Sequence, residues 1–153
     1  MAATDVDSVL RLEAEAPPDW AQAFADERAL AQWKAAMAPH LHRDFEYLVP
    51  WGPGGTTTHR GLNAWTKVWV DVLEAFDRVE RDNDPRHLLD LGDGRVLAYW
   101  ESRATSKEGV EVDTSVWSIH TVRDDLIYRI EFFSSPDAAF EAAGVEPATA
   151  MGS

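Results

Sequence analysis

The sequence predicts an α+β fold in which N-terminal helices accompany a mainly antiparallel sheet. In the first half, apolar residues recur at helical spacing, as in Leu30, Trp33 and Met37. From about residue 87 the pattern alternates with a period of two, and short turns rich in glycine and aspartate separate consecutive strands. Strands joined by such short turns run antiparallel.

The N-terminal part of the chain is expected to form three short helices. The first carries Val9 on its apolar side and is stopped by Pro17-Pro18. Asp19 and Asp26 stand where N-caps would begin the next two helices, and Pro39 ends the last of them. We expect one domain over residues 1–153, with the first helix (1–16) and the tail (145–153) peripheral to it.

A strand and a long helix are expected next. Residues 42–50 alternate in strand fashion, until Pro50 and the Gly/Pro cluster at 52–55 turn the chain into a loop. After Gly61, apolar residues from Leu62 to Phe76 lie on one helical face.

The remaining residues are expected to form a meander and a final helix. Strands over 96–103 and 112–121 and a last strand ending at Phe133 are separated by tight turns. Ser135 and Pro136 are typical of a helix start, and Gly144 of a helix end.

Composition narrows the functional classes. The formal net charge of −13 and the lack of a Lys/Arg cluster argue against nucleic-acid binding. The apolar runs are too short to span a membrane, and the N-terminus does not resemble a secretory signal, so a cytoplasmic location is expected. The chain has no cysteine, which excludes disulfides and thiolate chemistry.

Four segments carry a resemblance to a known family: HRDFEYLVPWGP, RGLNAW, DLGDGRVLAYW and RDDLIYRIEFFSSPDAAFEAAG. Together they resemble the SnoaL-like branch of the nuclear transport factor 2-like superfamily, over roughly residues 18–145. The resemblance implies a conical pocket between the concave sheet face and the helices. It leaves the activity open, because relatives include isomerases, cyclases, hydrolases, dehydratases and proteins without known catalysis. Many relatives form dimers through the convex face of the sheet.

Strand alternation indicates which residues face the pocket. On each meander strand one face is free of formal charge, and we assign that face to the interior. Trp117 then lies on the outer face, where an apolar patch would suit a homodimer interface. We expect Trp51 at the rim and Trp65 or Trp69 on the helix side. The substrate-binding residues expected from this assignment are Val49, Trp51, Trp69, Trp100, Val116, Ser118 and Phe132.

The carboxylates that relatives use for acid–base chemistry are missing from the matching positions. In ketosteroid isomerases an aspartate precedes the proline that ends the first strand, and here Val49 precedes Pro50. The other family positions match residues without a carboxylate, at or near Trp100, Ser102, Ser118, Phe132, Ser134 and Ser135.

His120 is the best remaining candidate for a general acid or base, because an imidazole titrates near neutral pH. Tyr47 and Tyr128 could donate hydrogen bonds to a substrate oxygen, and His59 lies in a loop near the expected mouth. Each of these could equally be a structural or solvated residue. If the assignment of faces were reversed, Asp113 and Glu131 would instead be paired carboxylates inside the cone.

Two functions follow from this sequence. The first is a cofactor-independent enzyme that transfers protons on an apolar cyclic, polyketide-like or terpenoid-like substrate, in a tryptophan-rich cavity suited to rings or fused polycycles. The second is a non-catalytic binding or accessory protein for a small hydrophobic ligand. Neither a metal nor a cofactor is expected, because His40, His42 and Asp44 lack further ligands and the glycines at 52–55 do not form a phosphate loop.

Overall fold

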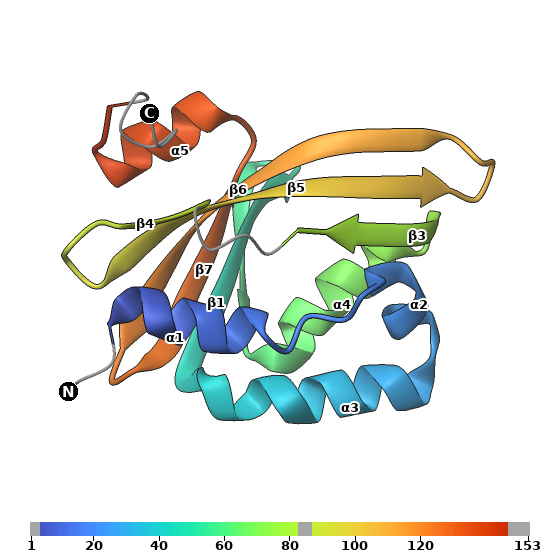
Figure 1. The fold of residues 1–153 in the computed structure, drawn as a ribbon, viewed down its shortest axis with the longest axis horizontal. Helices are drawn as coiled ribbons and strands as arrows, with labels where there is room; N and C mark the ends of the chain where they lie inside the picture. The colour runs from blue at the N-terminus through green and yellow to red at the C-terminus, as the bar shows by residue number, and fades with distance from the viewer. Residues whose placement is uncertain (1–3, 83–86, 147–153) are drawn as a thin grey trace.

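The computed structural model describes residues 4–82 and 87–146 (Figure 1). The helices are α1 (Asp5–Glu13), α2 (Trp20–Ala25), α3 (Glu27–Met37), α4 (Leu62–Leu73) and α5 (Pro136–Ala143), with a 3-10 turn, η1, at Ala38–His40. The strands are β1 (Leu41–Gly52), β2 (Gly55–Arg60), β3 (Phe76–Arg81), β4 (Leu88–Asp90), β5 (Arg95–Ser106), β6 (Glu111–Arg123) and β7 (Leu126–Phe133).

All seven strands form one curved sheet. Its order is β2-β1-β7-β6-β5-β3, with β4 also paired to β5, and every pairing is antiparallel except that of β1 with β7. Helices α1 to α4 pack against one face around a large apolar core, and α5 packs against the other (Figure 1). The predicted α+β cone is therefore confirmed. Among the described helices, none is both long and apolar enough to cross a membrane.

The helix ends follow the sequence closely. Asp19 and Asp26 are the N-caps of α2 and α3, and each accepts two backbone N–H groups of the first turn. Ser135 caps α5, and Gly144 ends it in the left-handed conformation that favours glycine. Asp19 has an additional role, because its Oδ1 also accepts the backbone N–H of Val79 on β3 at 3.0 Å. It therefore joins α2 to the edge strand of the sheet.

Strands β2 and β3 lie where no strand was expected. Residues 55–60, expected as a loop, form β2 and pair with β1; this strand is mostly polar and exposed, so it carries no apolar alternation. Phe76, expected at the end of the long helix, begins β3 instead. Of the five residues that follow Phe76, only Val79 is apolar, so β3 lacks the alternation of apolar and polar residues that predicts a strand.

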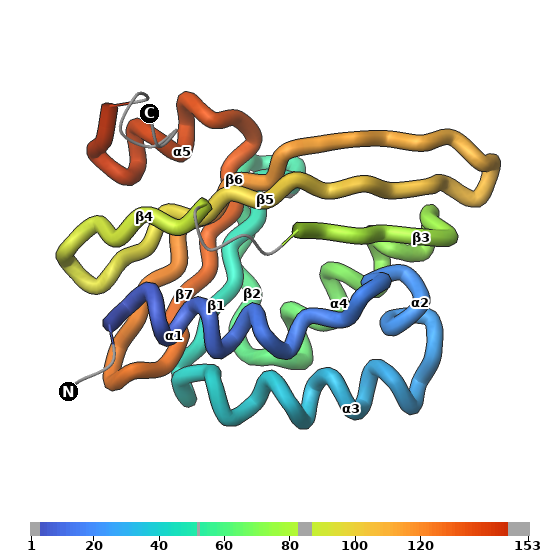
Figure 2. The backbone as a smooth tube through the Cα atoms, in the orientation of Figure 1, coloured from blue at the N-terminus to red at the C-terminus, as the bar shows by residue number. Residues whose placement is uncertain are grey.

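The N-terminal helix is not peripheral, contrary to expectation. Val9 is fully buried and Leu12 is 1% exposed, because α1 contacts β4, β5, β6 and β7. Figure 2 shows α1 passing in front of β7, with β4 above it in the view. The residues of the tail beyond Glu146 lie outside the described part of the chain.

The apolar patch on the outer face of the sheet is covered by helix α5 of the same chain. Trp117 does lie on the outer face, but it is buried against Phe140 of α5, with ring centroids 5.0 Å apart, and against Tyr99. The expectation that Trp117 is exposed for a partner subunit is therefore wrong, because α5 folds back over it. The homodimer itself stays a prediction.

The double role of Asp19 leads to a stability prediction. Replacing Asp19 with Ala removes a helix cap and leaves the N–H of Val79 without its acceptor, so we expect a loss of about 2–4 kcal/mol. Asp26→Ala removes a cap alone and should cost about 1 kcal/mol. Urea unfolding of both variants measures the difference, and equal losses would contradict the bridging role of Asp19.

Candidate functional site

A cavity of about 80 Å³ lies between the inner face of the sheet and helices α1 to α4. Its walls are mostly aromatic and aliphatic; besides polar atoms of the aromatic residues Tyr47 and Trp65, its polar lining groups belong to Glu13, Arg81, Ser102 and His120. The aromatic lining residues are Trp20, Tyr47, Trp65, Trp69, Trp100 and Phe132. The cavity is thus a small, largely apolar space with one cluster of ionisable side chains.

Strand alternation placed several side chains correctly. Of the residues expected at the pocket, Tyr47, Trp69, Trp100, Val116, His120 and Phe132 line the cavity. Val49 and Ser118 are buried in the core but do not line it. Trp51 is 52% exposed and contacts Trp69 and Phe132, with centroid distances of 5.7 and 6.5 Å. It therefore stands outside the cavity, beside two of the aromatic side chains that line it.

Tyr128 does not face the cavity, contrary to expectation. The β6–β7 pairing shifts from Thr121–Arg129 to Val122–Ile127, so Tyr128 is an extra, bulged residue. The bulge resets the alternation, and Ile127 and Ile130 both point inward. Tyr128 packs instead under the guanidinium of Arg123, 3.7 Å from its ring centroid.

His59 also lies away from the cavity. It belongs to β2 rather than to a loop, opposite Tyr47 in the β1–β2 register. Its Nε2 hydrogen-bonds Thr57 Oγ1 at 3.0 Å, and it is not a lining residue.

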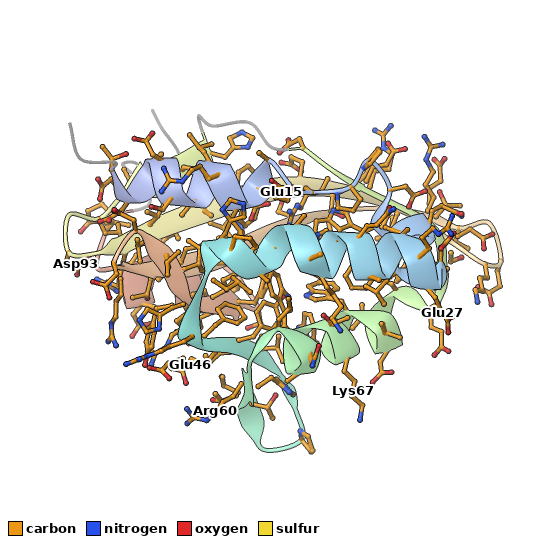
Figure 3. The ribbon with its side chains drawn as sticks, turned by 90° about the horizontal axis from the view of Figure 1, so that it is seen from below. Glu15, Glu27, Glu46, Arg60, Lys67 and Asp93 are labelled. Carbon is orange, nitrogen blue, oxygen red and sulfur yellow. The ribbon has the colours of Figure 1, made fainter. Side chains whose placement is uncertain are left out.

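The alternative pair of carboxylates is also outside the cone. Asp113 is exposed on the β5–β6 hairpin, 3.1 Å from Arg103 Nε. Glu131 is half-buried on the outer face, where burial raises its pKa despite the opposing effect of Arg129. Another buried carboxylate, Glu46, is held on the same face by Arg129 and Arg60 (Figure 3).

The carboxylate that does reach the cavity is Glu13, at the end of α1. Its Oε2 lies 2.5 Å from Nη2 of Arg81, and its Oε1 lies 3.7 Å from Nε2 of His120. These three residues come from α1, β3 and β6. The sequence carried one signal for this site, because Glu13 continues the apolar stripe of Val6 and Val9 as a charged residue on a buried helix face.

Charge compensation keeps Glu13 ionised. Burial by itself would raise the pKa of Glu13, but the Arg81 guanidinium and His120 outweigh it and hold the pKa below its ordinary value. Arg81 lies between two tryptophans, with its guanidinium carbon 4.8 Å from the Trp20 ring and 4.7 Å from the Trp100 ring. These cation–π contacts fix the guanidinium beside the carboxylate.

His120 is 1% exposed, and its two ring nitrogens have different surroundings. Nε2 faces the Glu13 carboxylate, whereas Nδ1 is buried without a hydrogen-bond partner among the described residues. A carboxylate favours the tautomer whose proton faces it. Nδ1 is then left with a free lone pair, which is the state of a general base.

Tyr47 supplies a neutral hydroxyl at the cavity. Its oxygen accepts a hydrogen bond from Nε1 of Trp69 at 2.5 Å. Burial raises the pKa of Tyr47 well above its ordinary value, so the hydroxyl keeps its proton at neutral pH. It can therefore act as a hydrogen-bond donor.

Within residues 4–82 and 87–146, no group of three or more His, Asp or Glu side chains is arranged to hold a metal ion. The ionisable cluster that lines the cavity contains one carboxylate, one imidazole and one guanidinium. Side chains of these types can accept and donate protons.

Comparisons with solved structures show the same fold at low sequence identity. TerC, crystallised with polyporic acid, is 17% identical, with 92% of this chain and 98% of that chain covered and a TM-score of 0.61. A proposed SnoaL-like polyketide cyclase from Jannaschia sp. CCS1 is 15% identical, with 96% and 99% covered and a TM-score of 0.62. A proposed isomerase from Bacillus subtilis is 16% identical, with 94% and 98% covered and a TM-score of 0.60.

The sequence itself matches a family model. None of the curated proteins matches the chain significantly. The model of the SnoaL-like domain matches residues 19–130, which begins after Glu13 and includes Arg81 and His120. Since this match spans most of the chain and the fold agrees, the protein belongs to the SnoaL-like family.

Proposed function

We propose that this protein is a cofactor-independent enzyme that transfers a proton on a small, apolar organic molecule. The observation that carries this proposal is the buried cluster of Glu13, Arg81 and His120 in an otherwise apolar, aromatic cavity. Buried ionisable groups with opposing charges at a cavity are typical of acid–base sites.

Each residue has a distinct task in this proposal. His120 removes a proton from the substrate through Nδ1 and returns it to another position, and Glu13 orients the ring and stabilises the imidazolium that forms. Negative charge that develops on a substrate oxygen is stabilised by Arg81 and by the hydroxyl of Tyr47. Because the walls are largely apolar, these electrostatic interactions are stronger than in solution.

The solved relatives support an organic small molecule as ligand without fixing its charge or the reaction. TerC was crystallised with polyporic acid, and two other neighbours carry proposed cyclase and isomerase functions. The alternative is a non-catalytic binding protein with the same cavity. One observation favours it: Glu13 and Arg81 pair with each other, as a purely structural ion pair would.

Deuterium exchange tests proton transfer without knowledge of the product. Cyclohex-2-enone in D₂O should exchange its acidic C–H groups faster with the protein than in buffer, as followed by ¹H NMR. His120→Gln should lower this rate by about 10²–10⁴-fold, because the base is lost. His59→Gln, on the exposed strand β2, is the matched control and should leave the rate unchanged.

Unchanged exchange in His120→Gln would remove His120 from the mechanism. Saturable binding of the ketone by the wild-type protein without any exchange would favour the binding protein instead.

The charge of Glu13 also predicts a pH dependence of stability. Because the folded-state pKa of Glu13 lies below the ordinary 4.5, its ionised form stabilises the fold above that pH. This contribution is lost as the pH falls through the lowered pKa. Glu13→Gln should therefore lower the free energy of unfolding by about 3–5 kcal/mol near pH 7, and by progressively less below pH 4.5.

Glu15→Gln provides the control on the same segment. Glu15 is partly exposed and lies 3.5 Å from His40, so its loss should cost less than about 1 kcal/mol at any pH. Chemical unfolding at several pH values measures both variants. A difference between wild type and Glu13→Gln that does not change with pH would contradict an ionised Glu13.

A further inference from the structure

We infer that the cavity selects neutral molecules no larger than about one ring, and holds them by an acceptor oxygen placed against Nε of Arg81 and Nε1 of Trp65. This deepens the proposed function, on which it rests for the site but not for the chemistry. Three properties of the cavity carry the inference: its size, its charge and its hydrogen-bond donors.

The size of the cavity sets an upper limit on the ligand. Its volume of about 80 Å³ is roughly half of the 150 Å³ at which an engineered cavity in another protein holds benzene. A single small ring therefore fits only if one or two side chains move. Fused polycycles, which the sequence led us to expect, are too large for this space.

The charge of the cavity favours a neutral ligand. Among the described residues, Glu13 and Arg81 are the only lining groups that carry a full charge, and they neutralise each other. The burial of an ionic ligand here is unfavourable, because Glu13 and Arg81 already pair with each other and leave no opposite charge free for the ligand. A neighbouring surface groove shares Arg81 and Ser102 with the cavity, and its carboxylates outnumber its arginines, Arg81 and Arg103, which disfavours the approach of anions. These carboxylates are Glu80, Asp82, Glu101 and Asp113.

The hydrogen-bond groups of the cavity favour a ligand that accepts. Nε of Arg81 and Nε1 of Trp65 are buried donors without a partner among the described residues, and both residues line the cavity. A buried donor without a partner is costly, and a ligand oxygen would remove that cost. On the acceptor side, Nδ1 of His120 is a buried nitrogen without a partner in the described part of the chain.

The two donors have different positions around the site. Arg81 Nε belongs to the guanidinium that already binds Glu13, so an oxygen placed there lies close to the acid–base pair. Trp65 lies on α4, in contact with Tyr47 at a ring-centroid distance of 5.1 Å. An oxygen between these groups could also accept from the Tyr47 hydroxyl. A carbonyl oxygen, which accepts two hydrogen bonds, is the group that suits this arrangement.

Equilibrium binding to the wild-type protein tests the inference with four matched probes. Cyclohex-2-enone is neutral and has an oxygen, cyclohexene lacks the oxygen, cyclohex-1-ene-1-carboxylate is an anion, and 1-tetralone is a fused bicycle. Calorimetry or ligand-observed NMR should show that the enone binds at least tenfold more tightly than each of the other three. Equal binding of cyclohexene, tighter binding of the carboxylate or the bicycle, or no binding of the enone would overturn the inference.

The variant Trp65→Phe tests whether the Trp65 N–H is one of the donors that bind the enone oxygen. Trp65→Phe keeps an aromatic ring but removes the N–H, so it should weaken enone binding about threefold to tenfold and leave cyclohexene binding unchanged. Trp33→Phe is the matched control, because the Trp33 Nε1 is likewise buried without a partner in the described chain but does not line the cavity. Equal effects of both variants on the enone would remove Trp65 from the site.

This experiment separates the inference from the proposed function. If the binding preferences hold but no deuterium exchange occurs, the substrate class stands and the catalytic proposal fails. If exchange occurs but the anion or the bicycle binds best, the catalytic proposal stands and the inference fails.

Discussion

Glu13 of α1 and Arg81 of β3 are joined by a buried ion pair that holds the N-terminal helix against the sheet. The cavity depends on this contact, because α1 supplies Leu12 and Glu13 to its lining. Removing one partner of such a pair leaves a buried charge without compensation, which is far more costly than removing both. Trp20 and Trp100 add to the constraint by enclosing the guanidinium. One end of the cone is therefore closed by electrostatics as well as by apolar packing.

The same ion pair gives the cavity its chemical character. A carboxylate beside Nε2 of His120 fixes the tautomer of the ring, while Arg81 keeps the local charge near zero. An imidazole, a neutral tyrosine hydroxyl and a compensated guanidinium then surround the space that a substrate would occupy. In the proposed reaction, charge develops on the substrate only when a proton moves, and that is when the donors contribute most. Val49 precedes the proline in the first strand, and the carboxylate that lines the cavity is Glu13 of α1.

Much of the fold and part of the site could be predicted from local patterns. The alternation of apolar side chains along β5 and β6 correctly placed Trp100, Val116 and His120 at the cavity. Each face of these strands packs against a different apolar cluster, so successive side chains keep pointing to opposite faces. It failed at Tyr128 because one bulged residue reverses the alternation without changing the composition of the strand. The pairing of Glu13 with Arg81, 68 residues apart, could not be predicted, since local spacing does not indicate which buried charges meet across the core. For the same reason, the packing of α5 over Trp117 was not visible in either segment alone.

The tautomer of His120 tests the central claim most directly. In ¹⁵N-labelled protein near pH 7, a two-bond ¹H–¹⁵N correlation spectrum reports the protonation of each ring nitrogen, and the signal missing from His120→Gln identifies His120 among the five histidines. We expect a protonated Nε2 facing Glu13 and an unprotonated Nδ1. A proton on Nδ1 with Nε2 unprotonated would contradict it, because Glu13 would then not orient the ring and the proposed base would have no free lone pair.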